Sequence, residues 1–257
     1  MSEEDNITEL ISAGADITGG AVGGVIGFLL AGPIGAAVGG ASGPAVTSVL
    51  KRIGLEIKER LISPREEKRI GAIIAYTVEK IKLRLERGAK LRADSFFNLS
   101  PAQRSDADEI YEATILAAQR EYQENKLKYY GNLVANISFD SACDKAQANH
   151  LIRITQELSW RQICILSMAG RVSTFNLRDS NYISNPTMSN AHVFLLDEIM
   201  ELYNKSLIVF GADFLMGITG IHPAKMRLEG VGEHLYNMME LSTISDKELE
   251  DIVILLR

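Results

Sequence analysis

The densest group of side chains that could bind a ligand lies between residues 80 and 92. The members that we predict to hold phosphate groups are Lys80, Arg84, Arg87, Lys90 and Arg92. On a helix, residues three and four positions apart share one face, so the first three of these bases would lie together. Such a face can bind the phosphates of a nucleotide or a nucleic acid. The same residues would also suit a solvated helix face or a contact with anionic lipid headgroups.

No other pattern in the sequence predicts catalysis or metal binding. There is no GxxxxGK[ST] phosphate loop, no GxSxG nucleophile motif and no HExxH motif. The four histidines are scattered, at positions 150, 192, 222 and 234. Cys143 and Cys164 stand apart without a CxxC pair, which predicts neither a disulfide framework nor a zinc site. We therefore expect a protein that is not an enzyme and that needs no cofactor and no metal.

The charges divide the chain into four segments. Residues 1–16 form an acidic leader with five acids and no base, and residues 17–50 carry no charge. Residues 51–159 hold 19 bases against 16 acids, whereas residues 160–257 hold 8 bases against 12 acids. The net charge of −6 argues against a surface made for nucleic acid over the whole molecule.

The uncharged segment has a small residue at every fourth position. These zipper positions, where we predict close helix packing, are Gly19, Gly23, Gly27, Ala31, Gly35, Gly39 and Gly43. Positions four apart lie on one helix face, so two backbones could approach closely along it, as small-xxx-small motifs do in lipid. As one helix the segment would be about 51 Å long, against roughly 30 Å for a hydrocarbon core. Gly32-Pro33, near its centre, predicts a kink or a hairpin.

This pattern predicts a membrane segment. Glycine costs a helix in water about 1 kcal/mol relative to alanine, whereas a bilayer enforces helical hydrogen bonding. Lys51 and Arg52 follow the segment directly, and such bases mark the cytosolic side. We therefore expect a bacterial inner-membrane location with the C-terminal domains in the cytoplasm. The alternatives are a hairpin buried in a soluble core and a flexible linker.

The rest of the chain reads as helices, followed by a mixed module. Ser63-Pro64-Arg65-Glu66 predicts a capping box at the start of one helix, and Ser100-Pro101 predicts the start of another that runs to about Lys126. A further helix is predicted over 145–158. In 160–257 we expect helices from Trp160 and over 191–205, strands over 206–211 and 225–229, and a helix over 234–241. This order resembles a winged helix, and its acidic balance favours protein contacts over duplex DNA.

A glycine zipper joined to a small helical sensor resembles the membrane effectors of bacterial anti-phage systems, of the Hailong or the jumbo-phage-killer type. The zipper positions carry the resemblance, over about the first fifth of the chain. It implies an oligomeric channel or membrane-disrupting effector of abortive infection, gated through its cytosolic domain. In the Hailong case the signal is an oligonucleotide made by a partner nucleotidyltransferase, which would give the basic cluster a role. The implied partners are a second copy, membrane lipid and that oligonucleotide.

The predicted fold is thus mainly α. It comprises a glycine-zipper transmembrane helix or helical hairpin, a cytosolic α-helical domain and a winged-helix-like α+β module. A rival hypothesis is a membrane-tethered module that binds nucleic acid or protein without forming a pore. A third is a zipper hairpin buried inside a helical oligomer.

Overall fold

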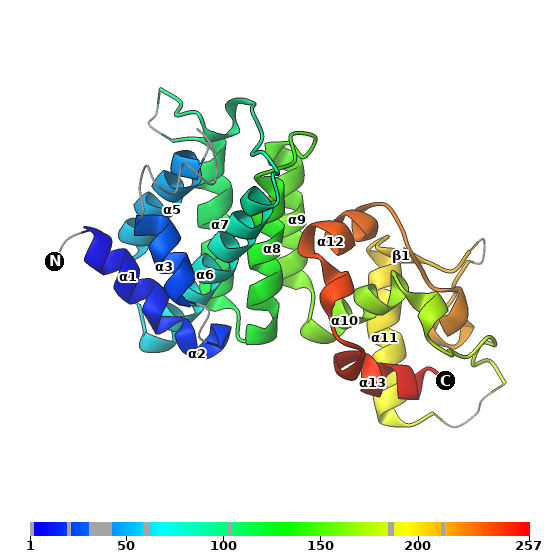
Figure 1. Ribbon diagram of the computed structural model, residues 1–257. Coiled ribbons are helices and arrows are strands. Elements are labelled where there is room, and N and C mark those ends of the chain that lie inside the picture. Colours follow the sequence, from blue (N-terminus) through cyan, green and yellow to red (C-terminus); the bar gives the residue numbers. More distant parts are fainter. Residues whose placement is uncertain are drawn as a thin grey trace. The chain divides into compact units, whose positions relative to one another are not determined.

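The computed structural model describes residues 3–19, 22–30, 43–58, 62–101, 104–184, 188–211 and 214–257. The described chain is mainly helical, as predicted, and it divides into two compact units (Figure 1). Unit 1 comprises Met1–Glu157 and unit 2 comprises Leu158–Arg257. The acidic leader, the uncharged segment and the slightly basic segment therefore all contribute to unit 1.

Unit 1 is built from helices packed around a long central one, α6. Its α-helices are α1 (Glu3–Ala13), α2 (Ala15–Thr18), α3 (Val22–Leu30), α5 (Gly43–Lys58), α6 (Pro64–Glu86), α7 (Asp106–Arg120), α8 (Leu127–Ile137) and α9 (Lys145–Glu157). Short 3-10 turns occur at η3 (Ser95–Phe97) and η4 (Glu124–Lys126). Helix α6 packs against α1, α2, α3, α7 and α8, so it forms the core of this unit (Figure 1).

The predicted start of α6 is confirmed. The backbone N–H and the hydroxyl of Ser63 both donate to Glu66 Oε2 at 2.7 Å, and Pro64 occupies the first turn. These hydrogen bonds hold the pKa of the Glu66 carboxyl low, at about 2. A capping box satisfies donors that the first helical turn leaves free.

The predicted start of the next helix is wrong by five residues. Helix α7 begins at Asp106, with Ser105 and Asp108 as its capping box, and it ends at Arg120. Asp108 also accepts a hydrogen bond from Arg52 Nη2 at 2.6 Å, which joins this cap to α5. That contact spans 56 residues, so the local sequence could not reveal it.

Glycine allows α1 and α6 to approach within backbone contact. A Cβ atom built on Gly71 would lie 2.0 Å from the carbonyl oxygen of Leu10. A Cβ atom built on Gly14 would lie 2.2 Å from the backbone nitrogen of Ala72. Close helix packing through small residues therefore occurs within this chain, at positions outside the predicted zipper register.

The prediction of a membrane-spanning segment, and with it of a channel and an inner-membrane location, is wrong. Across the described ranges, no helix combines the length and the apolar character that a membrane crossing requires. Helix α3 has nine residues and thus extends about 14 Å, against roughly 30 Å for a hydrocarbon core. Its bulky residues Val22, Val25, Phe28 and Leu29 are buried, and the helix packs on α1 and α6.

The apolar residues of helix α5 are likewise buried within unit 1. Val46, Val49, Leu50, Ile53 and Ile57 form a buried face against α1 and α7. The apolar side chains that suggested lipid contact thus cover other helices of the same unit. A hydrophobic pattern alone does not distinguish these two environments.

The structure places only part of the predicted zipper. Gly19 ends α2 in the left-handed conformation with φ 70°, Gly23 and Gly27 lie within α3, and Gly43 is the first residue of α5. The positions Ala31, Gly35 and Gly39, and the predicted break at 32–33, lie outside the described residues.

Unit 2 combines short helices with a two-stranded sheet. Its elements are α10 (Trp160–Ala169), η5 (Val172–Thr174), α11 (Asn190–Asn204), β1 (Ile208–Val209), η6 (Ile218–Gly220), η7 (Pro223–Lys225), β2 (Arg227–Leu228), α12 (Val231–Met239), η8 (Leu241–Thr243) and α13 (Asp246–Leu255). The strands are antiparallel, with Ile208 opposite Leu228, and both lie inside the predicted ranges. Helix α10 is the most buried element and packs against α11, α12 and α13.

Candidate functional site

The predicted basic cluster occupies the end of α6 and the segment that follows it. Arg84 lies in the last turn of α6, and its Nη1 donates to Asn136 Oδ1 on α8. The guanidinium of Arg84 also stacks 4.3 Å from the centre of the Phe139 ring. Arg84 therefore ties the end of α6 to the end of α8, which is a structural contact.

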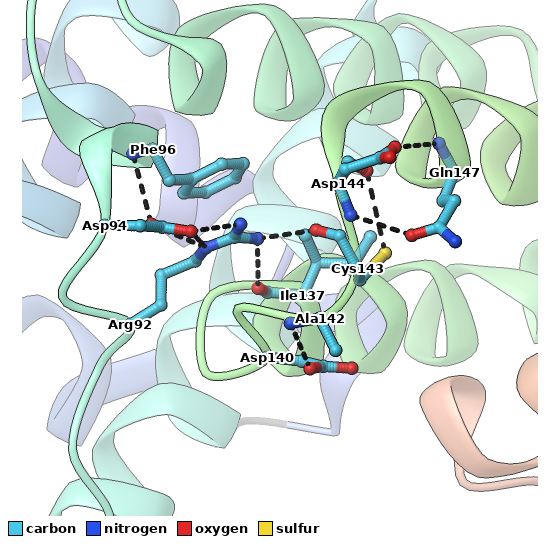
Figure 2. A network of polar contacts seen from close by, with 9 residues as sticks. All are labelled: Arg92, Asp94, Phe96, Ile137, Asp140, Ala142, Cys143, Asp144 and Gln147. Carbon is cyan, nitrogen blue, oxygen red and sulfur yellow. Dashed lines mark hydrogen bonds and ion pairs between the residues drawn. The ribbon is translucent and has the colours of Figure 1, made fainter.

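Arg92 has an even more enclosed position (Figure 2). Its side chain is 5% exposed, and Nε donates to both carboxylate oxygens of Asp94 at 2.9 Å. Nη1 donates to the carbonyl oxygens of Cys143 at 2.8 Å and Ile137 at 3.4 Å. The guanidinium also lies 4.4 Å from the centre of the Phe96 ring. Because Asp94 accepts these bonds from Arg92, the pKa of its carboxyl is lowered.

The other residues of this network shape the loop between α8 and α9. Asp144 and Gln147 exchange hydrogen bonds across the first turn of α9, at 2.9 and 2.8 Å (Figure 2). Asp140 Oδ1 accepts from the backbone N–H of Ala142 at 2.9 Å. Cys143 is buried, and burial raises the pKa of its thiol to about 11, so it is not a thiolate nucleophile near neutral pH. The network thus fastens two loops together.

The five predicted bases therefore differ in what they do. Arg84 and Arg92 make internal contacts, whereas the side chains of Arg87 and Lys90 are exposed. Lys80 is partly buried on α6. Phosphate binding by the complete set stays a prediction, and the exposed pair Arg87 and Lys90 is the part of it that solvent reaches most readily.

Replacing Arg92 should reveal its structural role. We expect Arg92→Ala to lower the free energy of unfolding by about 2–3 kcal/mol, because buried backbone carbonyl groups lose a charged donor. The matched control Lys90→Ala removes an exposed base two positions away and should change stability by less than about 0.5 kcal/mol. Urea unfolding followed by circular dichroism measures both. Equal effects of the two substitutions would contradict the structural role.

Metal or thiol chemistry finds no support in the described part of the chain. No group of three or more metal-ligating side chains converges among those residues. Cys164 is buried in α10, where burial raises the pKa of its thiol to about 12. Both thiols are therefore packed as apolar groups.

Helix α3 presents an exposed face made of glycine. Gly23, Gly24 and Gly27 are exposed, opposite the side chains that anchor this helix on the core. Among the described residues, no atom would lie within 4 Å of a Cβ atom built on Gly23 or Gly27, and only Lys82 Nζ would lie near one on Gly24, at 3.5 Å. We call these three residues the α3 glycine face. It is a smooth helix surface without a packing partner among the described residues.

Some exposed apolar side chains belong to unit 2. Among the described residues between 183 and 216, five large apolar side chains are exposed, and we call them the exposed apolar set of unit 2: Ile183 (69%), Val193 (36%), Phe194 (64%), Phe214 (92%) and Met216 (100%). Nothing in the spacing of these residues predicted their exposure, since apolar residues at helical spacing indicate a core more often than a surface.

Comparisons with protein families, with characterised proteins and with solved structures find no significant match to this chain. The description of this chain therefore rests on its own features. It is a mainly α-helical protein of two compact units, with a glycine face on unit 1 and several exposed apolar side chains on unit 2. The resemblance to anti-phage effectors stays a prediction drawn from the zipper positions.

Proposed function

We propose that this chain is a non-enzymatic protein that self-associates through the α3 glycine face. In this proposal, α3 of one copy packs backbone to backbone against a second copy, while its opposite side remains anchored on α6. The assembly retains the self-association expected from the zipper pattern, without a membrane-spanning segment. The observation that carries the proposal is that no atom of the described residues would lie within 4 Å of a Cβ atom at Gly23 or Gly27.

The cost of these glycines supports the proposal. Each one destabilises a helix in water by about 1 kcal/mol relative to alanine. At Gly71 and Gly14 the absence of a side chain allows two backbones to pack closely, and this packing offsets the cost. Alanine at either position would clash with the neighbouring backbone. At Gly23 and Gly27 the described structure offers no such compensation. A close contact with another copy would provide it.

Unit 2 has the role of a partner-binding module in this proposal. The order α10, α11, β1, β2, α12 supports a winged-helix-like interpretation of this unit. Its 8 bases against 12 acids do not suit the phosphate backbone of duplex DNA, whose binding depends on neutralising phosphates. Protein contacts therefore fit this unit better than DNA.

The mass of the protein in solution tests the proposal. Light scattering during size-exclusion chromatography, over a range of concentrations, should show an oligomer for the unaltered chain. Gly23→Leu and Gly27→Leu should each raise the dissociation constant about tenfold or more, because a large side chain separates the two backbones. Far-UV circular dichroism should stay unchanged.

The matched control is Ala146→Leu, which places the same side chain at an exposed position on α9. It should leave the mass of the oligomer unchanged. A wild-type protein that is monomeric at every concentration would overturn the proposal, as would an oligomer that survives both glycine substitutions.

A further inference from the structure

The ring of Tyr182 connects a loop of unit 2 to the first turn of α11. Tyr182 is fully buried, and its ring meets the ring of His192 edge to face, with the two ring centres 4.8 Å apart. The backbone N–H of Tyr182 donates to the carbonyl oxygen of Thr219 in η6 at 2.8 Å, and η6 also packs on α11. We call residues 178–182 the Tyr182 loop. Its contact with α11 thus includes a histidine ring, a group that can change its charge near neutral pH.

Backbone hydrogen bonds tie the start of the Tyr182 loop to other parts of unit 2. The backbone N–H of Arg178 donates to the carbonyl oxygen of Leu256 at 2.8 Å, and its carbonyl oxygen accepts from the backbone N–H of Ala224 at 3.1 Å. The Arg178 guanidinium lies 4.7 Å from the centre of the Tyr182 ring. A positive charge is therefore held beside the same ring that meets His192.

Three features of this arrangement oppose a positive charge on His192. Its Nε2 atom is buried and has no hydrogen-bond partner among the described residues, so an imidazolium would carry an N–H there without an acceptor. His192 is also the third residue of α11, where the free backbone N–H groups of the first turn carry partial positive charge. The third feature is the nearby guanidinium of Arg178. In agreement, the pKa of His192 is lowered, first by burial and then by the charge of Arg178.

The elements around α11 bring few charges that could offset this effect. Neither η6 nor β1, which both pack on α11, contains a charged residue. The charged groups and histidines of the other neighbouring elements are Arg178 and Asp179 from the Tyr182 loop, His222 after η6, Arg161 from α10, and Asp197, Glu198 and Glu201 from α11 itself. Glu198 pairs with Arg161, and Glu201 accepts from Gln162, so these two acids are used in contacts with α10. Among the described residues, the charge that shifts the pKa of His192 is that of Arg178, and it opposes protonation.

From this arrangement we infer that the contact between His192 and Tyr182 is an acid-sensitive switch, which keeps the Tyr182 loop closed on α11 while His192 is neutral and releases it when His192 binds a proton. The pKa of His192 is lower in the closed form than the value of about 6.5 for a free histidine. The closed form is therefore fully stable above about pH 6.5, and it loses stability as the pH falls from there through the lowered pKa. The inference goes beyond the proposed self-association and concerns unit 2 alone.

Amide hydrogen exchange of the full chain, followed by mass spectrometry, tests the switch. The variant His192→Phe keeps a ring against Tyr182 and cannot be protonated. At about pH 7 the Tyr182 loop should exchange equally fast in this variant and in the wild type, because His192 is neutral in both the closed and the open form. At about pH 5 it should exchange several times faster in the wild type, up to the limit of about thirtyfold that one proton sets. Comparing the two proteins at the same pH cancels the intrinsic pH dependence of exchange.

Three further variants assign the response to His192. His192→Gln is a second uncharged replacement and should also lack the faster exchange at about pH 5, even if phenylalanine does not fit the site. His234→Gln is the matched control, because it removes an exposed histidine near the start of α12, and it should behave like the wild type. His222→Gln should also retain the response, although His222 has a buried Nδ1 atom without a partner among the described residues. In the wild type, the NMR titration of the His192 ring should have its midpoint below about pH 6.5.

Three results would overturn the inference. The first is equal exchange of the Tyr182 loop at about pH 5 in the wild type and in both His192 variants. The second is a response that disappears in His222→Gln or His234→Gln and persists in the His192 variants. The third is a His192 titration midpoint at or above about pH 6.5. Gly23→Leu should retain the acid response, so failure of the glycine-face proposal would leave this test intact.

Discussion

Replacing Gly71 by valine should destabilise unit 1 by about 3 kcal/mol or more. Even a single Cβ atom at this position would lie 2.0 Å from the carbonyl oxygen of Leu10, so α1 and α6 would have to separate. Leu10 and Ile11 are fully buried, and that separation would also loosen their packing. Gly71→Ala should show a smaller loss, because alanine recovers about 1 kcal/mol of helix propensity.

The control for this prediction is Gly27→Ala. An added Cβ atom there meets no atom of the described residues within 4 Å, so the substitution should be neutral or should stabilise the helix by up to about 1 kcal/mol. Urea unfolding gives the free energies, and amide hydrogen exchange of α1 and α6 assigns the change to unit 1. A Gly71 variant as stable as the Gly27 variant would show that the two helices do not approach as described.

Gly71 and Gly27 together show what the zipper pattern could predict and what it could not. The four-residue spacing correctly indicated a helical segment with one smooth face, as α3 shows at Gly23 and Gly27. It could not indicate what the opposite face contacts. Val25 and Leu29 are buried, α3 packs on helices of the same unit, and one of these, α6, begins 34 residues after α3 ends.

Local signals in the sequence were accurate where local hydrogen bonds decide the structure. The capping box at Ser63 needs only the four residues of its own turn, and the sequence reveals it completely. The start of α7 depends instead on Asp108, which bonds both to Ser105 and to the distant Arg52. The sequence pattern around Ser100, five residues earlier, resembles a helix start, and the prediction placed the start there.

The basic cluster shows the same limit for a candidate site. Helical spacing predicted Lys80, Arg84 and Arg87 on one helix face, and the structure places the first two in α6 and Arg87 just after its end. The spacing does not show which groups a guanidinium contacts across the fold. Asn136, Phe139 and the carbonyl oxygen of Cys143 come from the end of α8 and the loop after it. Because of these contacts, Arg84 and Arg92, which were predicted to bind a ligand, instead connect parts of the fold.

The exposed apolar set of unit 2 could not be predicted, for the opposite reason. Phe214 and Met216 flank Leu215, so the three residues form a short apolar run that resembles a buried segment. In the structure only Leu215 is buried, whereas its two neighbours are almost completely exposed. Which side of such a run faces solvent depends on the path of the backbone around α11.

Replacing Glu121 by glutamine should lower the free energy of unfolding of unit 1 by about 3–5 kcal/mol. Lys126 is 2% exposed, and its ammonium group pairs with the carboxylate of Glu121, which is 7% exposed. The ammonium also lies 5.6 Å from the centre of the Tyr130 ring. Glutamine can still accept the hydrogen bond from the backbone N–H of Gln123, so the main loss is the charge that compensates Lys126.

The double variant Glu121→Leu with Lys126→Met is the matched control. Removing both charges also removes the cost of burying them, so it should be close to wild type or more stable by about 1–4 kcal/mol. A double-mutant cycle with Lys126→Met alone then gives the coupling between the two side chains. A double variant as unstable as Glu121→Gln would show that the site needs these polar groups for their shape and hydrogen bonds.

The pH dependence separates an uncompensated charge from a simple packing defect. Burial lowers the pKa of Lys126, and the carboxylate of Glu121 opposes this only in part. In Glu121→Gln the opposition is lost, so the folded protein releases the Lys126 proton at a lower pH than the unfolded chain, whose lysine pKa is about 10.4. Between these two pKa values the unfolded state binds more protons, and the stability of the folded state therefore rises with pH. The stability deficit of Glu121→Gln should thus shrink between neutral pH and about pH 10, whereas a packing defect would give a deficit independent of pH.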